Sequence, residues 1–135
     1  MDRDDWDLSE RVVGAMIEVH RQLGPGLLEP TYEACLAEEL RHLEIDFVRQ
    51  APISVRYRGV TVECAYRADF IVEDSLLIEL KSVDTVLPIH VAQVLTYLKL
   101  TCLDVALLVN FNAPTIRSQL RRLRRRDQRA ASLAG

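Results

Sequence analysis

The chain has 135 residues, of which 49% are hydrophobic and 27% are charged. That length supports one domain with a buried core and excludes a second full domain. Five glycines and five prolines exclude a collagen-like or low-complexity chain, and no apolar run approaches the roughly 20 residues of a membrane span. The sequence therefore predicts a soluble protein with no membrane partner.

The net charge of −3 is unevenly distributed along the chain. Residues 117–135 contain seven arginines and one aspartate, a net charge of +6, which leaves −9 for residues 1–116. An acidic body with a basic end indicates either a polyanionic partner or a solvated helix face. If the basic end packs on the acidic body, the asymmetry is an internal neutralisation instead.

The first residues and the cysteines both favour a cytoplasmic location. The opening MDRDDWD is acidic where a secretory signal would be basic and then apolar. Cys35, Cys64 and Cys102 are odd in number and far apart, so they predict neither a disulfide framework nor a zinc site. We interpret them as small buried hydrophobic residues.

Two helices are predicted at the start of the chain. After Ser9, a candidate N-cap, apolar residues recur with helical spacing until the Gly24-Pro25-Gly26 corner ends the pattern. A second helix is expected from about Leu27 to about Leu43, with Glu29 in its first turn.

Strands follow these helices. From residue 45 apolar and polar residues alternate, and Arg58-Gly59 interrupts the alternation as a turn. Residues 66–72 and 76–83 form a further strand pair, residues 88–100 a helix, and residues 105–109 a strand buried on both faces. The order ααβββ(β)αβ predicts an α/β or α+β domain whose last β-α-β unit holds two parallel strands.

The register of the strand pair at residues 66–83 follows from its side chains. A two-residue loop would set Asp69 opposite Leu80, whereas a three-residue loop sets Asp69 opposite Glu79 and leaves one face wholly apolar. The three-residue loop is therefore favoured. Because strand residues two apart point the same way, Asp69, Glu79 and Lys81 should share the other face.

Two opposed carboxylates repel, and burying them together is costly without a cation. Lys81 is one candidate, as a structural ion pair. A divalent cation held by Asp69 and Glu79, with Lys81 beside it, is the other. Spacing alone leaves both open.

These residues belong to a longer series of motifs. The series begins at the Gly-Pro-Gly corner and ends after the last predicted strand. Its members are Gly26, Glu29 and Tyr32 as G-x-x-E-x-x-Y, then Tyr66-Arg67-Ala68-Asp69, Glu79-Leu80-Lys81, His90-x-x-Gln93-x-x-x-Tyr97 and Leu108-Val109-Asn110-Phe111-Asn112.

With these motifs in order over about residues 8–112, the chain resembles the GxxExxY protein family, which is assigned to the PD-(D/E)XK nuclease-like superfamily. The resemblance implies an α/β fold with a restriction-endonuclease-like core: a central mixed β-sheet flanked by helices, with two N-terminal helices preceding the sheet. The proline of the superfamily's name is absent, because Ala68 precedes Asp69.

By the same resemblance, Asp69 and Glu79 are metal-binding carboxylates and Lys81 is the catalytic lysine. Glu29 is the additional acidic residue on an early helix, where the positive end of the helix dipole keeps a carboxylate ionised. We interpret Tyr32 as a supporting core residue whose hydroxyl has a partner, such as a site carboxylate. Gln93 and Tyr97 lie beside the site or simply contact the sheet.

The resulting hypothesis is a hydrolase, an endo- or exonuclease that cleaves nucleic-acid phosphodiesters with Mg²⁺ or Mn²⁺. The cation would neutralise charge on the phosphoryl oxygens and activate water. The alternative is a non-catalytic module that keeps the fold to bind DNA, another nucleic acid or a protein. A body with a charge of −9 favours that alternative. The small surface is compatible with a homodimer.

The basic end is treated as separate from the domain, which is assigned to residues 1–116. Ile116, Leu120 and Leu123 recur at helical spacing, so residues 117–135 are predicted to form a short basic helix with a frayed end. As a tethering arm for substrate, this tail offers several arginines to phosphates. They are Arg121, Arg122, Arg124, Arg125 and Arg126.

Overall fold

The computed structural model describes residues 3–125, with the side chains of residues 3–5, 64 and 65 left aside. Its helices and strands follow the predicted order up to residue 110. They are α1 (Arg3–Leu23), α2 (Glu29–His42), β1 (Phe47–Tyr57), β2 (Val60–Val72), β3 (Leu76–Lys81), α3 (Pro88–Thr101), β4 (Val105–Asn110), the 3₁₀ turn η1 (Arg117–Gln119) and β5 (Leu120–Arg124).

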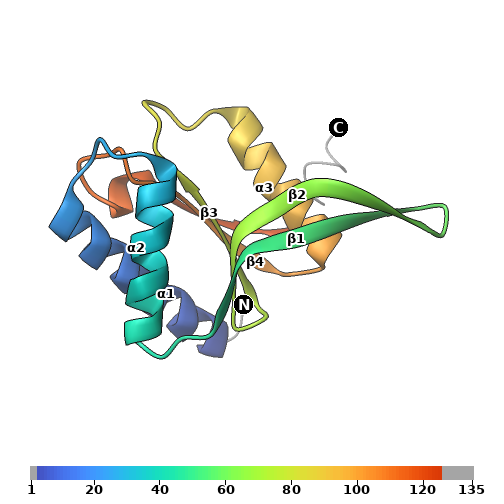
Figure 1. Cartoon of the computed structure of the whole chain (residues 1–135), viewed down its shortest axis with the longest axis horizontal. Helices are drawn as coiled ribbons and strands as arrows, with labels where there is room; N and C mark the ends of the chain where they lie inside the picture. Colours follow the sequence, from blue (N-terminus) through green and yellow to red (C-terminus); the bar gives the residue numbers. More distant parts are fainter. Residues whose placement is uncertain (1–2, 126–135) are drawn as a thin grey trace.

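The described strands form one mixed sheet in the order β1-β2-β3-β4-β5. β3 and β4 are parallel, as predicted from the β-α-β unit, and the other neighbours are antiparallel. Figure 1 shows the sheet between the α1–α2 pair and α3. The α/β fold with two N-terminal helices before a central mixed sheet is therefore confirmed.

Each face of the sheet has its own hydrophobic core. Tyr32, Phe70 and Leu107 are fully buried in the core under α1 and α2, whereas Leu98 and Leu108 are buried in the core under α3. Leu107 and Leu108 are neighbours in β4, so they point to opposite faces. This explains why the sequence of β4 is an unbroken apolar run from residue 105 to residue 109.

The register predicted for β2 and β3 is confirmed. Val72 pairs with Leu76 and Phe70 with Ile78, which leaves three residues in the loop. The expected apolar face lies in the core under α1 and α2. Its members are Phe70, Val72, Leu76, Ile78 and Leu80.

The predicted helix after residue 117 is wrong for the described part of the tail. Residues 120–124 are strand β5, which pairs antiparallel with β4. Leu120 contacts the core under α1 and α2, and Leu123 contacts the core under α3. Two apolar residues three apart lie on one face of a helix, but on a strand they point to opposite faces and can pack in two different cores. Residues 126–135 lie outside the described part of the chain.

The N-terminal helix also differs from its prediction. α1 begins at Arg3, and Ser9 lies inside it, fully buried, rather than capping it. The Ser9 hydroxyl accepts hydrogen bonds from the Arg122 guanidinium, at 3.1 Å from Nε and 2.8 Å from Nη2. The residue therefore joins α1 to β5.

Two other expectations concern cysteine burial and membranes. Cys35 is partly buried, but Cys102 is exposed at the left-handed C-cap of α3, which corrects its predicted burial. Across residues 3–125 no helix combines the length and the hydropathy needed to span a bilayer.

Candidate active site

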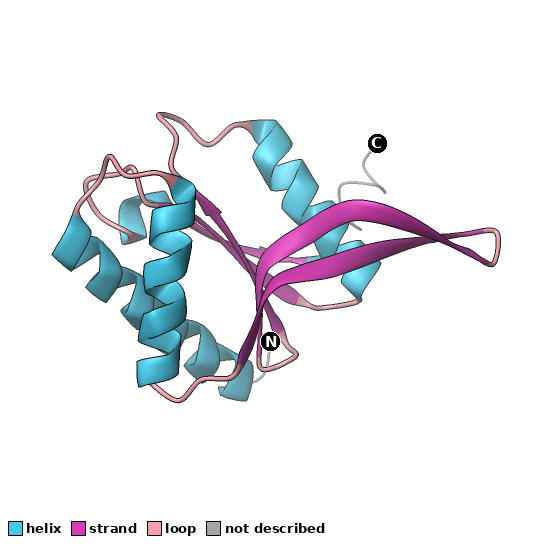
Figure 2. Cartoon of the chain, in the orientation of Figure 1, coloured by secondary structure: helices cyan, strands magenta, loops and turns pink. Residues whose placement is uncertain are grey.

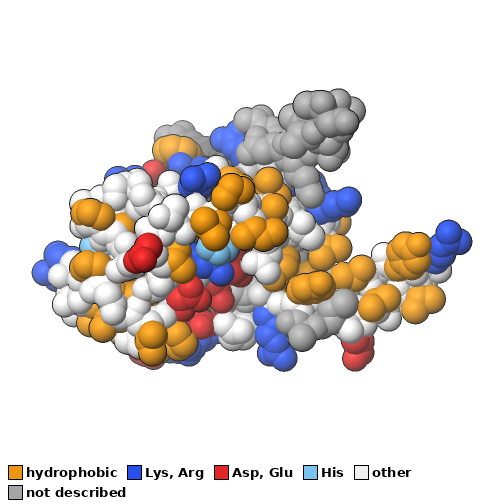
Figure 3. Space-filling view, turned by 90° about the horizontal axis from the view of Figure 1, so that it is seen from above, with side chains coloured by type: hydrophobic (Ala, Val, Ile, Leu, Met, Phe, Trp, Pro, Cys, Tyr) orange, Lys and Arg blue, Asp and Glu red, His pale blue; other side chains and the backbone are white. Residues whose placement is uncertain are grey.

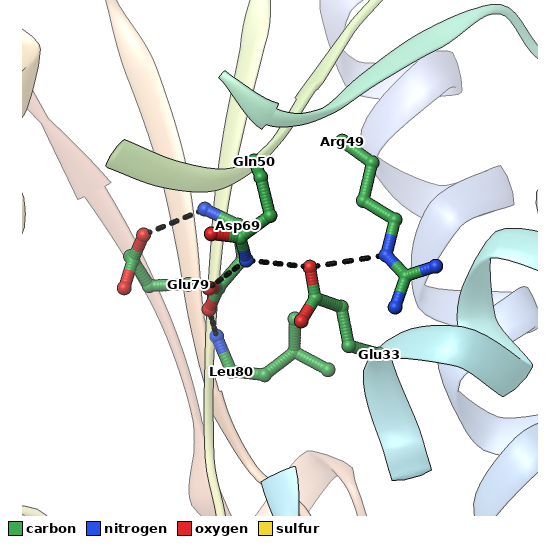
Figure 4. A network of polar contacts seen from close by, with 6 residues as sticks. All are labelled: Glu33, Arg49, Gln50, Asp69, Glu79 and Leu80. Atoms are coloured by element: carbon green, nitrogen blue, oxygen red, sulfur yellow. Dashed lines mark hydrogen bonds and ion pairs between the residues drawn. The ribbon is translucent and has the colours of Figure 1, made fainter. Parts of the chain in front are cut away.

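The site lies where β2 and β3 separate. Their paired positions stop at Phe70 and Ile78. Beyond this point side chains replace the backbone ladder. The Asp69 N–H donates to Glu79 Oε1 at 2.9 Å, and the Leu80 N–H donates to Asp69 Oδ2 at 2.8 Å. Each carboxylate is thus held by the backbone of the opposite strand, as Figure 4 shows.

The alternation of β2 breaks at Asp69. Ala68 packs in the core under α3 and Phe70 in the core under α1 and α2, although two residues so spaced on a regular strand share a face. Opposite Asp69, the β1 residue Gln50 adopts a positive φ of 54° between two paired positions. This local irregularity sets Asp69 between β1 and β3.

Both carboxylates are difficult to ionise. Glu79 is only 6% exposed, and burial together with the Asp69 charge raises the pKa of Glu79 to about 8. Burial also raises the pKa of Asp69 to about 6, where the charges of Glu33 and Glu29 add to the effect. Burial of the pair therefore outweighs the positive charge nearby.

Lys81 faces the pair without closing an ion pair. Its charge lowers the pKa of both Asp69 and Glu79, but neither carboxylate lies within 4.0 Å of its ammonium among the described ion pairs. The structural ion pair offered as one alternative is thus not formed. The end of β3 holds Lys81 half-buried beside the carboxylates.

Glu29 is the first residue of α2 and lies toward the Asp69–Glu79 pair. Its Oε1 accepts a hydrogen bond of 3.1 Å from the Ser82 N–H, and the Ser82 hydroxyl donates to the Leu27 carbonyl. The Glu29 charge raises the pKa of both Asp69 and Glu79. The loop before α2 is therefore tied to the segment after β3, which brings the helix acid toward the strand acids.

Two further polar residues at the site were not predicted from the sequence. The Gln50 Nε2 donates to Glu33 Oε1 at 2.7 Å and to Asp69 Oδ1 at 3.4 Å, while Arg49 donates to the same Glu33 oxygen (Figure 4). Glu33 lies four residues after Glu29, hence on the same helix face, and this spacing is the signal that could have found it. No pattern in β1 marked Gln50.

The α3 residues Gln93 and Tyr97 lie one helical turn apart. Tyr97 is 5% exposed and packs in the core under α3, and burial, followed by the charge of Glu79, raises its pKa. Tyr97 thus contacts the sheet and also lies near Glu79. Gln93 is exposed, and its place beside the site stays a prediction.

Tyr32 supports the site at a distance. Its hydroxyl donates to the Gly24 carbonyl and accepts from the Leu27 N–H, and its ring stacks on Phe111 at 4.6 Å. The expected hydrogen-bond partner is therefore the loop backbone rather than a site carboxylate. Tyr32 fixes the Gly-Pro-Gly corner from which Glu29 follows.

Asn110 is a buried residue whose role the sequence did not indicate. Its side chain accepts from the N–H groups of Val83 and Asn112 and donates to the Val83 carbonyl. These bonds hold the segment that leaves β3 directly after Lys81.

A comparison with protein-family models identifies the family of this chain. A model described as PD-(D/E)XK nuclease superfamily matches residues 6–123. The chain belongs to the PD-(D/E)XK nuclease superfamily. Separate searches of curated proteins and of solved structures found no match.

As a PD-(D/E)XK chain, it has Asp69 and Glu79-x-Lys81 at the expected strand pair, with Ala68 in place of the proline. The superfamily generally uses divalent metal ions and acts on nucleic acids. Within residues 3–125 no three His, Cys, Asp or Glu side chains form a ready-made metal-ligand set. The two interlocked carboxylates still fit a hard cation, because both are oxygen ligands that lack a compensating charge.

The described part of the basic end, residues 117–125, packs on the acidic body of this PD-(D/E)XK domain. Arg117 pairs with Glu10 at 3.1 Å, and Arg125 pairs with Asp104 at 2.8 Å. Arg122 is half-buried, with its guanidinium 4.5 Å from the Trp6 ring centroid. Within residues 117–125, part of the charge asymmetry is therefore internal neutralisation. Of the remaining arginines proposed to contact nucleic acid, Arg121 is exposed, Arg124 is half-buried and Arg126 lies outside the described residues.

Proposed function

We propose that this protein is a metal-dependent nuclease that hydrolyses nucleic-acid phosphodiester bonds at Asp69, Glu79 and Lys81. The observation that carries this proposal is the interlocked carboxylate pair: Glu79 is buried, Asp69 is partly buried, burial raises the pKa of both, and the Lys81 that faces them contacts neither carboxylate. A pair kept only for structure has no physical need for this arrangement, because a direct ion pair or apolar residues would be less costly.

The chemistry assigned to each residue follows from its position. Bound Mg²⁺ or Mn²⁺ supplies charge neutralisation at the phosphate and an activated water. Asp69 and Glu79 would hold the cation, and Glu29, which forms no ready-made three-ligand set with them, would add negative charge from α2. Lys81 would place its ammonium against the negative charge that develops on the phosphoryl oxygens, or orient the attacking water.

The neighbours position this set. Gln50 orients Asp69 through its hydrogen bond and also binds Glu33. Tyr97, which packs in the core under α3 near Glu79, would limit the access of bulk water from that side. Within the superfamily, the spaced motifs from Gly26 to Asn112 support membership of the GxxExxY family.

The decisive experiment is a cleavage assay. Single-stranded, double-stranded and structured DNA and RNA would be incubated with the protein and Mg²⁺ or Mn²⁺, alongside Glu79→Gln and Lys81→Ala. Both variants should lose at least about a hundredfold in rate, since each removes a group that acts in the transition state. Activity that survives both substitutions would identify a contaminant and overturn the proposal.

Matched controls are available close by. Asp74→Asn changes an exposed carboxylate in the loop between β2 and β3, and Lys99→Ala changes an exposed lysine on α3. Both controls should cleave like the wild type. Binding of nucleic acid without cleavage under any condition would favour the non-catalytic module instead.

A thermal assay tests the metal site without relying on activity. Mn²⁺ should raise the unfolding midpoint of the wild type by mass action, and Asp69→Asn should abolish the rise. An equal rise in both proteins would show that Mn²⁺ binds elsewhere.

A further inference from the structure

The outer half of the β1–β2 hairpin projects away from the body of the protein. We call residues 54–67 the arm. Figures 1 and 2 show it extending well beyond the helices and the rest of the sheet. Its tip is a two-residue turn in which Arg58 and Gly59 have φ values of 50° and 77°, the combination typical of a tight hairpin turn. The arm is therefore an ordered ribbon with both faces in solvent.

One face of the tip is apolar. Tyr57 pairs with Val60 and Val55 with Val62, so these four side chains share a face, whereas Arg56 and Thr61 lie on the other. Tyr57 is 64% exposed and Val60 is 62% exposed. Figure 3 shows these hydrophobic groups standing out from the body with a basic group at the end. A projecting apolar face of this kind marks an interaction surface.

The arm is also basic, and its charges are available. Arg56, Arg58 and Arg67 are exposed, and none of them is in an ion pair with another described side chain. Against them the arm carries only Glu63. Elsewhere in residues 3–125 six arginines are in ion pairs. They are Arg21, Arg41, Arg49, Arg117, Arg122 and Arg125.

We propose that the arm binds duplex DNA and delivers it to the carboxylate site, an inference that rests on the proposed nuclease function. A two-stranded ribbon fits the major groove of B-form DNA, and the narrow major groove of A-form RNA excludes it. The arginines would contact phosphates, while the apolar tip would contact base edges or enter a base step.

The arm leads directly to the site. β2 runs from the tip through Arg67 to Asp69, so the ribbon and the carboxylate are parts of one strand. At the root of the arm, the half-exposed ring of Tyr66 lies 6.2 Å from the Tyr97 ring, which packs beside Glu79. DNA gripped by the arm would therefore lie next to the cleavage chemistry.

The size of the arm favours DNA over a second copy of the chain. The body that a second copy would present is acidic, and five of its described carboxylates are already in ion pairs, those of Glu10, Glu18, Glu33, Glu38 and Asp104. The thin tip also offers little area against the roughly 800 Å² per partner of a standard interface. A polyanion satisfies the unpaired arginines more fully.

The test is binding of the full chain to a fluorescent duplex DNA of about 20 base pairs in EDTA, at several salt concentrations. The double variant R56A/R58A is compared with R21A/R41A, which removes the same charge from exposed, ion-paired positions on α1 and α2. The arm variant should bind at least about tenfold more weakly and flatten the log–log salt slope by about 2, since each phosphate contact contributes about 0.9. The helix variant should show much smaller changes.

Several outcomes would overturn the arm proposal. These are equal weakening by both double variants, binding of duplex RNA as tightly as duplex DNA, or no duplex binding by the wild type. A wild-type dimer in sedimentation that becomes monomeric in Y57A/V60A, with DNA binding unchanged, would assign the arm to a second copy. Cleavage is measured separately. DNA binding that depends on the arm, without any cleavage, would support the arm proposal and contradict the nuclease function. Cleavage of duplex DNA with an unchanged KM in R56A/R58A would contradict the arm proposal and support the nuclease function.

Discussion

Single residues at this site interrupt the backbone pairing between the strands that carry them. Asp69 and Glu79 take hydrogen bonds that backbone carbonyls would otherwise accept, and so the two strands separate where the chemistry is proposed to occur. The fold supports this because Phe70 and Ile78, one position away, are fully buried. Strain or charge at one pair is tolerable where its neighbours are well packed.

The metal-free protein should lose stability as pH rises through the range set by Glu79. Its pKa is raised in the folded state, from 4.5 to about 8, so between these values the folded protein holds a proton that the unfolded chain releases. The free energy of unfolding then falls with increasing pH. Asp69 contributes the same sign up to about pH 6. In EDTA, the melting temperature of the wild type should fall between pH 6 and 8, whereas that of Glu79→Gln should stay level.

Glu63→Gln, which changes an exposed acid on the arm, serves as the control and should follow the wild type. Parallel curves for wild type and Glu79→Gln would show that Glu79 ionises normally.

Removing the Tyr32 hydroxyl should destabilise the protein. Tyr32→Phe loses a hydrogen bond donated to the Gly24 carbonyl and one accepted from the Leu27 N–H, both at a buried ring. We expect a loss of about 1–2 kcal/mol in the free energy of unfolding, measured by urea denaturation. Tyr57→Phe removes an exposed hydroxyl and should change stability by less than about 0.5 kcal/mol. Equal effects would contradict the role given to the Tyr32 hydroxyl.

At the scale of elements, β5 shows why a short amphipathic segment is hard to assign. Leu120 and Leu123 are three residues apart, which fits one helix face and also fits two faces of a strand. The neighbour decides between them: β4 is buried on both faces, and without β5 its outer edge would expose unpaired N–H and carbonyl groups. Pairing with β4 satisfies those groups.

Deleting β5 should therefore unfold the domain. A chain ending at residue 119 would uncover the β4 edge and remove Leu120 and Leu123 from the two cores. A chain ending at residue 125 should retain a cooperative melting transition. If the shorter chain also melts cooperatively, with unchanged circular dichroism, β5 is dispensable.

At the scale of the whole molecule, one sheet lies between two hydrophobic cores. β4 contributes side chains to both cores, because Leu107 faces α1 and α2 while its neighbour Leu108 faces α3. The site lies on the other side of β3, between β2 and β3, near residues from both layers. Glu29 comes from α2 and Tyr97 from α3, so the geometry of the site depends on the packing of both layers.

Shortening a side chain at the centre of the sheet should lower the free energy of unfolding far more than shortening one on the surface. Leu107→Ala removes a fully buried side chain and should lower the free energy of unfolding by about 2–5 kcal/mol in urea denaturation. Leu28→Ala, at a residue that is 75% exposed, should cost less than about 0.5 kcal/mol. Similar losses for both would contradict the assignment of Leu107 to the core.

The sequence by itself determined the element order up to residue 110, the parallel pair at the last β-α-β unit and the register that opposes Asp69 to Glu79. These follow from local periodicity and from the requirement that charge not be set against an apolar face. Only the tertiary structure decided the strand at residues 120–124, the pairing of the C-terminal arginines with the acidic body, and the places of Glu33 and Gln50. Each of these depends on a neighbour distant in the chain: a free strand edge, an opposite charge, or a carboxylate on another element. Such neighbours leave no periodic signal in the sequence.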